Sequence, residues 1–382
     1  MKQRIVVLGM MGAYPFGGQT WLYINWLTSL RALGHEVWYV EDNCVWQYDP
    51  DYDGFTDACR YGVEHVSRTL DQIGFGDRWI YRWAMPPEGC WGATLEQLRE
   101  LYRSCDLLLN VCVATELRDD HLLAPYRVWV ETDPVLAELR VAGGDERVRR
   151  QFELHQAFAT YGENYGAADC RVPLHGIDFI KIRQPIDLEL WPFSYDAAAP
   201  NFTTVGNFRT DGYDLPFDGD VYHWSKHHEW ERFADLPSLT AQPFQLALKA
   251  NEEDTAGMKA KGWDVVPPIP MSLDVFGGYR QFIQGSRGQF TVAKDQNVRL
   301  RSGWFSERDA CYLASGKPVV AQDTAFQLPR GNGLFGVSTP AEAAAAIDEI
   351  NADYQRQCRA ARQLAEDYFN GPDVVAELLN WL

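Results

Sequence analysis

The first forty residues have the pattern of a buried strand, a helix and a second strand. Residues 4–9 form an apolar run that ends at a glycine, which is typical of a strand inside a parallel sheet. Gly17 and Gly18 then open a helical pattern of apolar residues that ends at Gly34, a typical helix C-cap. Residues 36–40 form the next apolar run. Because two strands joined through a helix pair in parallel, the sequence predicts an α/β fold.

The same alternation continues to the end of the chain and is interrupted once. In the first part it predicts helices at 95–102 and 145–158, and strands at 106–113, 127–131 and 179–183. Prolines at 185, 192 and 200 then bracket a segment without a clear period, which indicates a linker. The second part predicts helices at 273–284, at 306–315 and after Thr339, and strands at 202–208, 244–249, 263–266, 290–293 and 317–322.

A chain of 382 residues is too long for one ordinary core, so two domains are expected. We therefore predict two Rossmann-like, doubly wound domains that face each other across a cleft, at residues 1–195 and 200–365. Open parallel sheets bind ligands at the carboxyl ends of their strands. The functional residues are expected at those two edges.

The formal net charge of −18 excludes some partners and constrains others. A field of this sign repels nucleic acid, and no basic stripe offsets it. An anionic ligand must instead be bound by a few placed cations and by helix N-termini. No C-x-x-C pair and no apolar run near 20 residues occurs, so we expect a cytoplasmic protein without a transmembrane segment. Peripheral membrane contact stays open.

The most informative motif lies at residues 305–324, where a polar loop, a helix, a glycine stop and a strand follow one another. Ser306 can cap the helix, and the free N–H groups there can bind an anion. Glu307 suits the helix dipole at that end, whereas Arg308 does not and can hold a phosphate in bidentate fashion. The strand begins in a Gly-Lys-Pro-Val-Val sequence at residues 316–320.

This stretch resembles the C-terminal signature of GT-B glycosyltransferases. The resemblance implies that the helix start binds the diphosphate and ribose of a nucleotide sugar, through Ser306, Glu307 and Arg308. It also implies that Asp323 and Thr324, in the loop after the strand, contact the sugar. The loop at 9–18, with Gly17 and Gly18, resembles the N-terminal glycine element that approaches donor or acceptor. The last residues, 366–382, resemble the segment that crosses back onto the first domain.

The sequence departs from the family at one point. Many retaining members carry two glutamates eight residues apart before the Gly-x-Pro-Val-Val element. Those positions hold Gly303 and Cys311 in this chain. Retention of anomeric configuration is therefore not carried over.

Further basic residues are candidates for binding the donor phosphates. The resemblance implies Arg209 and Lys226, which follow the first strand of the second part. Lys294 follows the strand at 290–293 and so belongs to a ligand-binding sheet edge. Tyr279 and Arg280 are further candidates near the same nucleotide.

A base for an acceptor hydroxyl needs a carboxylate or an imidazole within hydrogen-bond reach. Asp133 follows the strand at 127–131 and is the first candidate, Glu163 is the second and His121 the third. Each of the two carboxylates can instead be a turn cap.

Metal ligation is not expected. Residues 49–54 imitate the start of an EF-hand loop, but the twelfth position is Arg60 in place of a bidentate glutamate. His223, His227, His228 and Glu231 have helical spacing, although a surface helix start explains them as well.

Together these features predict a metal-independent glycosyltransferase without a cofactor. Its donor would be a nucleotide-diphosphate sugar, and its acceptor a hydroxyl of a small molecule, lipid or glycan. Two alternatives stay open on the same fold: a sugar-nucleotide epimerase or hydrolase, and a non-catalytic sugar-nucleotide-binding protein.

Overall fold

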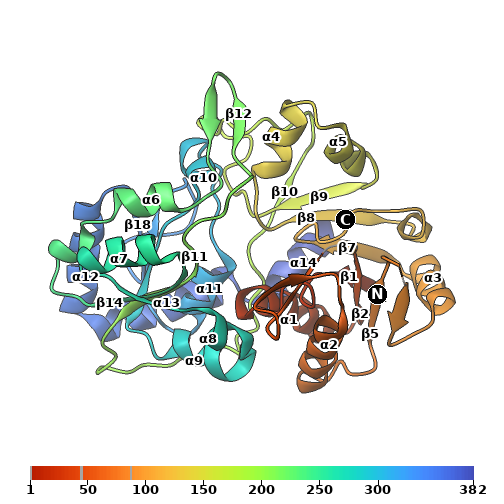
Figure 1. Ribbon diagram of the computed structural model, residues 1–382, viewed down its shortest axis with the longest axis horizontal. Coiled ribbons are helices and arrows are strands. Elements are labelled where there is room, and N and C mark those ends of the chain that lie inside the picture. Colours follow the sequence, from red (N-terminus) through yellow and green to blue (C-terminus); the bar gives the residue numbers. More distant parts are fainter. Residues whose placement is uncertain (1, 44–45, 87) are drawn as a thin grey trace.

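The computed structural model describes residues 2–43, 46–86 and 88–382. Two α/β halves lie side by side, the first coloured red to yellow and the second green to blue (Figure 1). Each half is built on a parallel or mainly parallel sheet with helices packed against it, so the predicted fold class is confirmed.

The first sheet has eight strands in the order β10-β9-β8-β7-β1-β2-β5-β6. All neighbours pair in parallel except β5 and β6, which are antiparallel. The strands are β1 (Arg4–Leu8), β2 (Glu36–Asn43), β5 (Trp79–Trp83), β6 (Gly89–Trp91), β7 (Leu107–Val111), β8 (Arg127–Glu131), β9 (Ala157–Thr160) and β10 (Ile180–Lys181). Its helices are α1 (Gly17–Ala32), α2 (Arg60–Gln72), α3 (Leu95–Ser104), η1 (His121–Leu123), α4 (Leu136–Ala142) and α5 (Glu146–Glu153).

The second sheet has six strands, all parallel, in the order β15-β14-β11-β16-β17-β18. These are β11 (Phe202–Asn207), β14 (Phe244–Lys249), β15 (Asp264–Val266), β16 (Gly288–Thr291), β17 (Val319–Gln322) and β18 (Leu334–Val337). Its helices are α6 (His227–Arg232), η2 (Leu236–Ser238), α7 (Glu252–Ala260), α8 (Ile269–Leu273), η3 (Val275–Tyr279), α9 (Arg280–Gln284), α10 (Asp295–Arg299), α11 (Glu307–Ala314), α12 (Pro340–Ala352) and α13 (Tyr354–Tyr368).

Two antiparallel hairpins project from the sheets. One consists of β3 (Gln47–Asp49) and β4 (Gly54–Thr56), the other of β12 (Leu215–Phe217) and β13 (Asp220–Tyr222). The first hairpin occupies the segment whose sequence imitates an EF-hand loop. Arg60, at the twelfth position of that imitation, forms an ion pair of 3.1 Å with Asp51.

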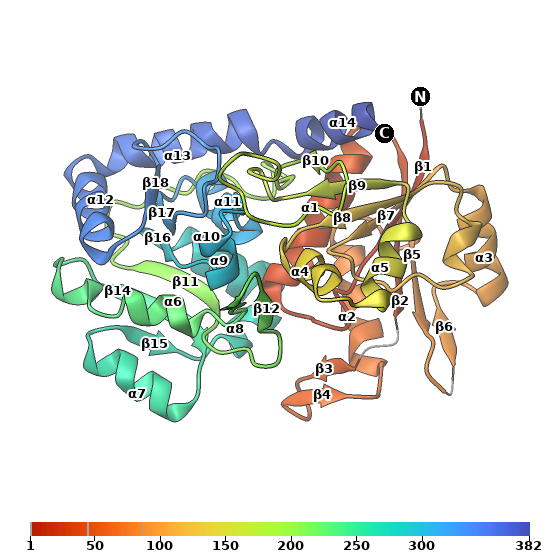
Figure 2. The same ribbon diagram turned by 90° about the horizontal axis from the view of Figure 1, so that it is seen from above.

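The final helix α14 (Gly371–Trp381) lies against α1 of the first half. Figure 2 shows α13 and α14 running along one edge of the molecule, from the second half to the first. The Gly371 N–H donates to the Ile186 carbonyl over 2.9 Å. A side chain at Gly371 would lie only 2.0 Å from Ser29 Oγ, so the crossing is tightly packed.

The two halves share a hydrophobic contact at helix α1. Trp21 of α1 packs against Phe276 with ring centroids 5.3 Å apart, and its indole N–H donates to the Val275 carbonyl over 3.0 Å. Both partners belong to η3, a π-helical turn of the second half. The start of α1 is therefore fixed against both halves.

Two predicted helices are wrong in part. The helix expected at 145–158 ends at Glu153, because residues 157–160 form β9 and pair with β8. The helix expected at 273–284 is broken at η3, where the Asp274 carboxylate accepts the Gly277 N–H over 3.1 Å. Strand pairing and a side-chain cap thus override the local helical period. The Thr339 cap is confirmed, since its side chain accepts the Glu342 N–H.

No helix in the described ranges is long and apolar enough to cross a membrane.

Candidate active site

A cleft of about 520 Å³ lies between the carboxyl ends of the two sheets. The first half contributes mainly aromatic and small residues: Met10, Tyr14, Phe16, Gly18, Gln19, Phe55 and Asp133. The second half contributes the cations Lys226, Lys249, Lys294 and Arg308, together with Trp224, Tyr279 and the end of β11. The two walls therefore differ in chemistry, one apolar and one basic.

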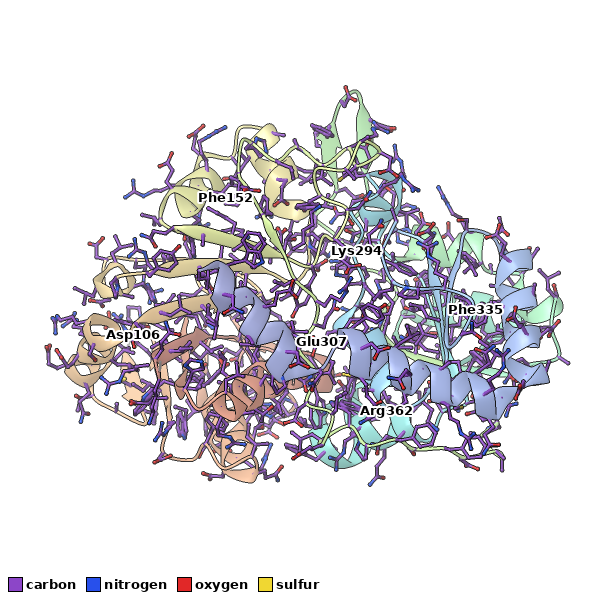
Figure 3. The ribbon with its side chains drawn as sticks, turned by 180° about the vertical axis from the view of Figure 1, so that it is seen from behind. Asp106, Phe152, Lys294, Glu307, Phe335 and Arg362 are labelled. Carbon is purple, nitrogen blue, oxygen red and sulfur yellow. The ribbon has the colours of Figure 1, made fainter. Side chains whose placement is uncertain are left out.

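Lys294 follows β16 and reaches across the cleft to the first half. Its ammonium group forms an ion pair with the carboxylate of Asp133, which follows β8. The same ammonium lies 2.9 Å from the centroid of the Trp224 ring, in a cation–π contact. Figure 3 shows Lys294 between the two halves. Burial lowers the pKa of Lys294, and Asp133 opposes this shift.

Lys226 precedes α6 and lies close to the other cations. Its ammonium donates to the Val292 carbonyl over 2.9 Å and lies 5.3 Å from the centroid of the Trp304 ring. Burial and the nearby Arg308 guanidinium lower the pKa of Lys226 to about 7. Burial and the Arg308 charge thus disfavour the charged form of Lys226. An anion bound beside its ammonium would stabilise that form and raise the pKa again.

Arg308, in the first turn of α11, is held by its own half. Its guanidinium donates to the Val205 carbonyl, and to Thr291 Oγ1 over 3.2 Å. The buried Arg308 Nε has no hydrogen-bond partner among the described residues.

The glycine loop at residues 9–18 is held in place by hydrogen bonds to a buried carboxylate. Glu41 accepts the N–H groups of Gly12 and Ala13, each over 2.8 Å, and the Tyr39 hydroxyl over 2.8 Å. Burial raises the pKa of Glu41 to about 7, although these hydrogen bonds oppose the shift. Glu41 thereby positions the loop that supplies part of the apolar wall.

Gly17 and Gly18 allow the loop to approach the second half. A Cβ at Gly17 would lie 2.3 Å from Cγ of Tyr279, and the Gly17 N–H donates to Ser272 Oγ over 3.1 Å. A Cβ at Gly18 would lie 3.3 Å from the Tyr279 hydroxyl. Gly18 lines the cleft, and Gly17 lies at the contact between the halves.

Several predicted site residues lie outside the residues that line the cleft. Ser306 is the N-cap residue of α11, but its side chain makes no capping hydrogen bond. Glu307 Oε1 accepts the Asn25 side-chain N–H over 2.7 Å, and burial raises the pKa of Glu307 well above its usual range. Glu307 therefore contacts α1 of the first half. Figure 3 shows Glu307 near the centre of the molecule, where the two halves meet.

The sugar-contact candidates form contacts within the second half. Asp323 accepts the Ala325 N–H and the Arg330 guanidinium, each over 2.8 Å, and Thr324 Oγ1 donates to the Trp304 carbonyl over 2.6 Å. Arg209, a candidate for binding the donor phosphates, likewise forms a bidentate pair with Asp254, with distances of 2.6 and 2.9 Å. None of these three residues is part of the described cleft lining.

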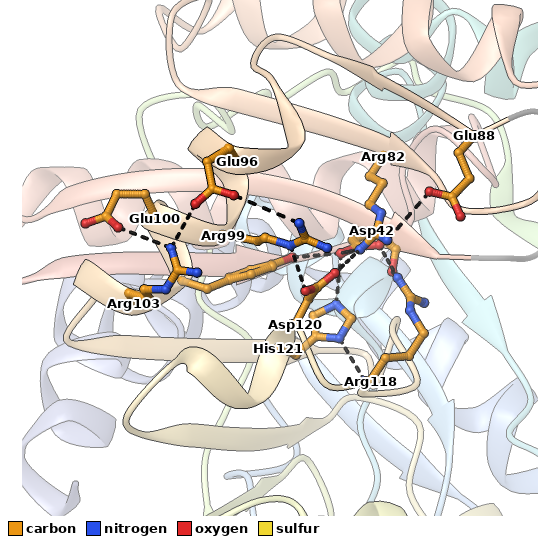
Figure 4. A network of polar contacts seen from close by, with 11 residues as sticks. Asp42, Arg82, Glu88, Glu96, Arg99, Glu100, Arg103, Arg118, Asp120 and His121 are labelled. Carbon is orange, nitrogen blue, oxygen red and sulfur yellow. Dashed lines mark hydrogen bonds and ion pairs between the residues drawn. The ribbon is translucent and has the colours of Figure 1, made fainter.

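The other two base candidates are also elsewhere. Glu163 pairs with Arg183 over 2.6 Å and accepts the Gln327 N–H over 2.9 Å. His121 is fully buried, with Nε2 3.1 Å from Asp42 Oδ2. Figure 4 shows Asp42 in a network with His121, Arg82 and Arg118. Burial opposes ionisation of Asp42, but these partners lower its pKa to about 2.

Sequence reasoning missed Lys249, Trp224 and Glu41. Lys249 is the last residue of β14, so its place at a strand end was a usable signal. Trp224 is two residues from Lys226 and could have been found from that spacing. Glu41 directly follows the apolar run at residues 36–40, so its place near the carboxyl end of that strand was also a usable signal.

The positions of the missing glutamate pair are closed in this fold. Gly303 has a φ of +80°, and a Cβ there would lie 2.3 Å from the Asn164 nitrogen. Cys311 is buried within α11. The departure from the retaining pattern is therefore built into the backbone at one of the two positions.

Comparisons with solved structures identify the architecture. An α-glucosyltransferase in complex with UDP and DNA superposes with a TM-score of 0.58 at 13% identity, covering 100% of this chain and 99% of that one. HepE from Anabaena, in complex with UDP and glucose, gives 0.56 at 14% identity, with 100% of both chains covered. The chain has a GT-B fold.

Sucrose-phosphate synthase from Thermosynechococcus elongatus is similar over 100% of this chain and 98% of its own, with a TM-score of 0.53 and 12% identity. No protein-family profile matches the sequence. No curated protein sequence matches it. The resemblance predicted from residues 305–324 is confirmed at the level of the fold.

Proposed function

We propose that this GT-B chain is a glycosyltransferase that binds a nucleotide-diphosphate sugar in the cleft. The observation that carries the proposal is the convergence of Lys226, Lys294 and Arg308 on one wall of a cleft in a protein of net charge −18. Burial lowers the pKa of both lysines, so an anion that replaced water there would be stabilised. A diphosphate has the charge and the size to bridge these groups.

The proposed roles of the two domains follow from the chemistry of the two cleft walls. Residues 200–365 form the donor domain, and residues 1–195, with the tail 366–382, form the acceptor domain. The solved proteins of similar fold that contain UDP make UDP-sugars the first donors to test. The aromatic wall around Tyr14 and Phe55, whose ring centroids lie 5.6 Å apart, would receive the acceptor.

In the proposed reaction the bond between the anomeric carbon and the diphosphate oxygen breaks, and its electron pair stays on the diphosphate. The three cations stabilise that charge, without a metal ion. The acceptor oxygen forms the new bond to the anomeric carbon and gives up its proton to the carboxylate of Asp133. Because Lys294 would turn to the diphosphate, donor binding would release Asp133 for this role.

Calorimetry with a panel of nucleotide sugars tests the donor site. Lys294→Ala and Arg308→Ala should each weaken binding by about tenfold or more, the usual loss for a hydrogen bond to a charged group. Lys261→Ala is the matched control, because Lys261 pairs with Asp235 on the surface of the same half. Unchanged binding in both cleft variants would refute the site.

Turnover separates the three functions on this fold. A transferase releases the nucleotide at a high rate only when an acceptor is present. Release or sugar isomerisation with the donor alone would indicate a hydrolase or an epimerase. Donor binding without turnover across an acceptor panel would indicate a binding protein.

A further inference from the structure

Three side chains that commonly bind metal ions converge beside the cleft, outside the residues that line it. Asp214 precedes β12, His223 follows β13, and His228 lies in the first turn of α6. One ligand atom from each lies within 4.8 Å of the others. The hairpin β12–β13 therefore brings together residues that lie up to 14 positions apart in the sequence.

The contacts within this cluster already orient the ligand groups. His223 Nδ1 lies 2.7 Å from Asp214 Oδ2, and the rings of His223 and His228 stack with centroids 4.0 Å apart. The carboxylate side chain is 43% exposed and that of His223 is 31% exposed, so an ion and its waters can enter.

We propose that Asp214, His223 and His228 bind a divalent transition-metal ion, with zinc as the first choice. Imidazole nitrogens select Zn²⁺, Ni²⁺ or Cu²⁺, whereas Mg²⁺ and Ca²⁺ require mostly oxygen ligands. Two imidazoles and one carboxylate give three protein ligands, and water completes the coordination. Asp214 is exposed and the two imidazoles are half-buried, and their ligand atoms already lie within 4.8 Å of one another.

The bound ion would stabilise the position of Trp224, which lines one wall of the cleft. Asp214 Oδ1 accepts the N–H of Trp224 over 2.9 Å, and the Trp224 ring faces the Lys294 ammonium. Strand β12 packs against α4 of the first half. A metal at the base of the hairpin would therefore stabilise both Trp224 and this contact between the halves. The role is structural and does not depend on sugar transfer.

The structure also supplies a matched control. His227, next to His228, is not one of the three converging ligand residues, and its Nδ1 lies 2.7 Å from Ser225 Oγ. Glu231, which shares the helical spacing, lies 4.0 Å from Arg209. The ligand set therefore contains Asp214, which is distant in sequence, and does not contain His227 or Glu231 of α6.

Calorimetry of the untagged, full-length protein, stripped with EDTA and titrated with ZnCl2, tests the proposal in the absence of any donor. We expect one Zn²⁺ per chain and no comparable binding of MgCl2. His223→Ala, His228→Ala and Asp214→Asn should each weaken zinc binding by about tenfold or more. His227→Ala should bind zinc as the wild type does.

Thermal unfolding gives an independent measurement. Zinc should raise the Tm of the wild type and of His227→Ala, because the ion binds only the folded state, and should leave His228→Ala unchanged. Circular dichroism without metal checks that each variant is folded. Absence of saturable zinc binding, or equal losses in His228→Ala and His227→Ala, would overturn the proposal.

Discussion

The ammonium of Lys294 and the carboxylate of Asp133 form an ion pair that joins the two halves across the cleft. Lys294 is 8% exposed, so this pair is shielded from water on the lysine side. An anionic donor that binds Lys294 must compete with Asp133. The proposed donor binding and the availability of the carboxylate would therefore be coupled through one lysine.

The first prediction concerns Asp133→Asn. Removing the carboxylate frees Lys294 and removes a negative charge near the diphosphate, so nucleotide-sugar binding should stay equal or become tighter. Transfer should fall by about 10²–10⁴-fold, the usual contribution of a general base. Calorimetry and acceptor-dependent nucleotide release measure the two effects separately. Asp235→Asn, an exposed partner of Lys261, is the control. Weaker donor binding in Asp133→Asn would contradict the competition.

The second prediction follows from the pKa of Lys226, which is about 7. Below this pH the ammonium is charged and attracts a diphosphate, and above it the charge is lost. Nucleotide-sugar affinity should therefore fall between pH 6 and pH 8.5, by at most about tenfold per pH unit for one proton. Lys226→Arg keeps its charge throughout and should show a flatter profile. Identical profiles for the two proteins would exclude Lys226 from the phosphate site.

The elements with strong local signals were predicted correctly, because buried runs, glycine stops and caps act within a few residues. Side-chain partners were not, since they come from distant segments. Glu307 bonds to Asn25, which lies 282 positions away, and Arg209 bonds to Asp254. Lys294 faces the cleft because it follows the carboxyl end of a parallel strand, β16. The apolar run at residues 290–293 indicates this strand end in the sequence.

A third prediction concerns the stability contributed by Glu41. Its folded pKa of about 7 lies above the ordinary value of 4.5. The raised pKa contributes stability that is complete below pH 4.5 and is lost as the pH rises through 7. Glu41→Gln has no such titration, so the wild type should lose up to about 3 kcal/mol relative to this variant between pH 5 and pH 8. Urea unfolding at both pH values measures the difference.

The amide of Glu41→Gln also changes the hydrogen bonds of the glycine loop. The amide NH2 group accepts no hydrogen bond, whereas the hydroxyl of a protonated carboxyl group keeps some acceptor capacity, so one of the N–H groups of Gly12 and Ala13 loses its partner. We expect Glu41→Gln to be less stable than the wild type at pH 5, where the carboxyl group is protonated in the folded state. A stability difference that does not change with pH would show that Glu41 does not titrate in this range.

The last prediction compares two adjacent glycines at the start of α1. Gly17→Ala would place a methyl group 2.3 Å from Cγ of Tyr279, which is buried and cannot rotate away without disturbing η3. Such overpacking should destabilise the fold by about 1–3 kcal/mol. Gly18→Ala would place a methyl group no closer than 3.3 Å to Tyr279, at its hydroxyl, and should cost much less. Urea unfolding of both variants measures the difference, and equal stabilities would mean that the contact between α1 and η3 adjusts freely.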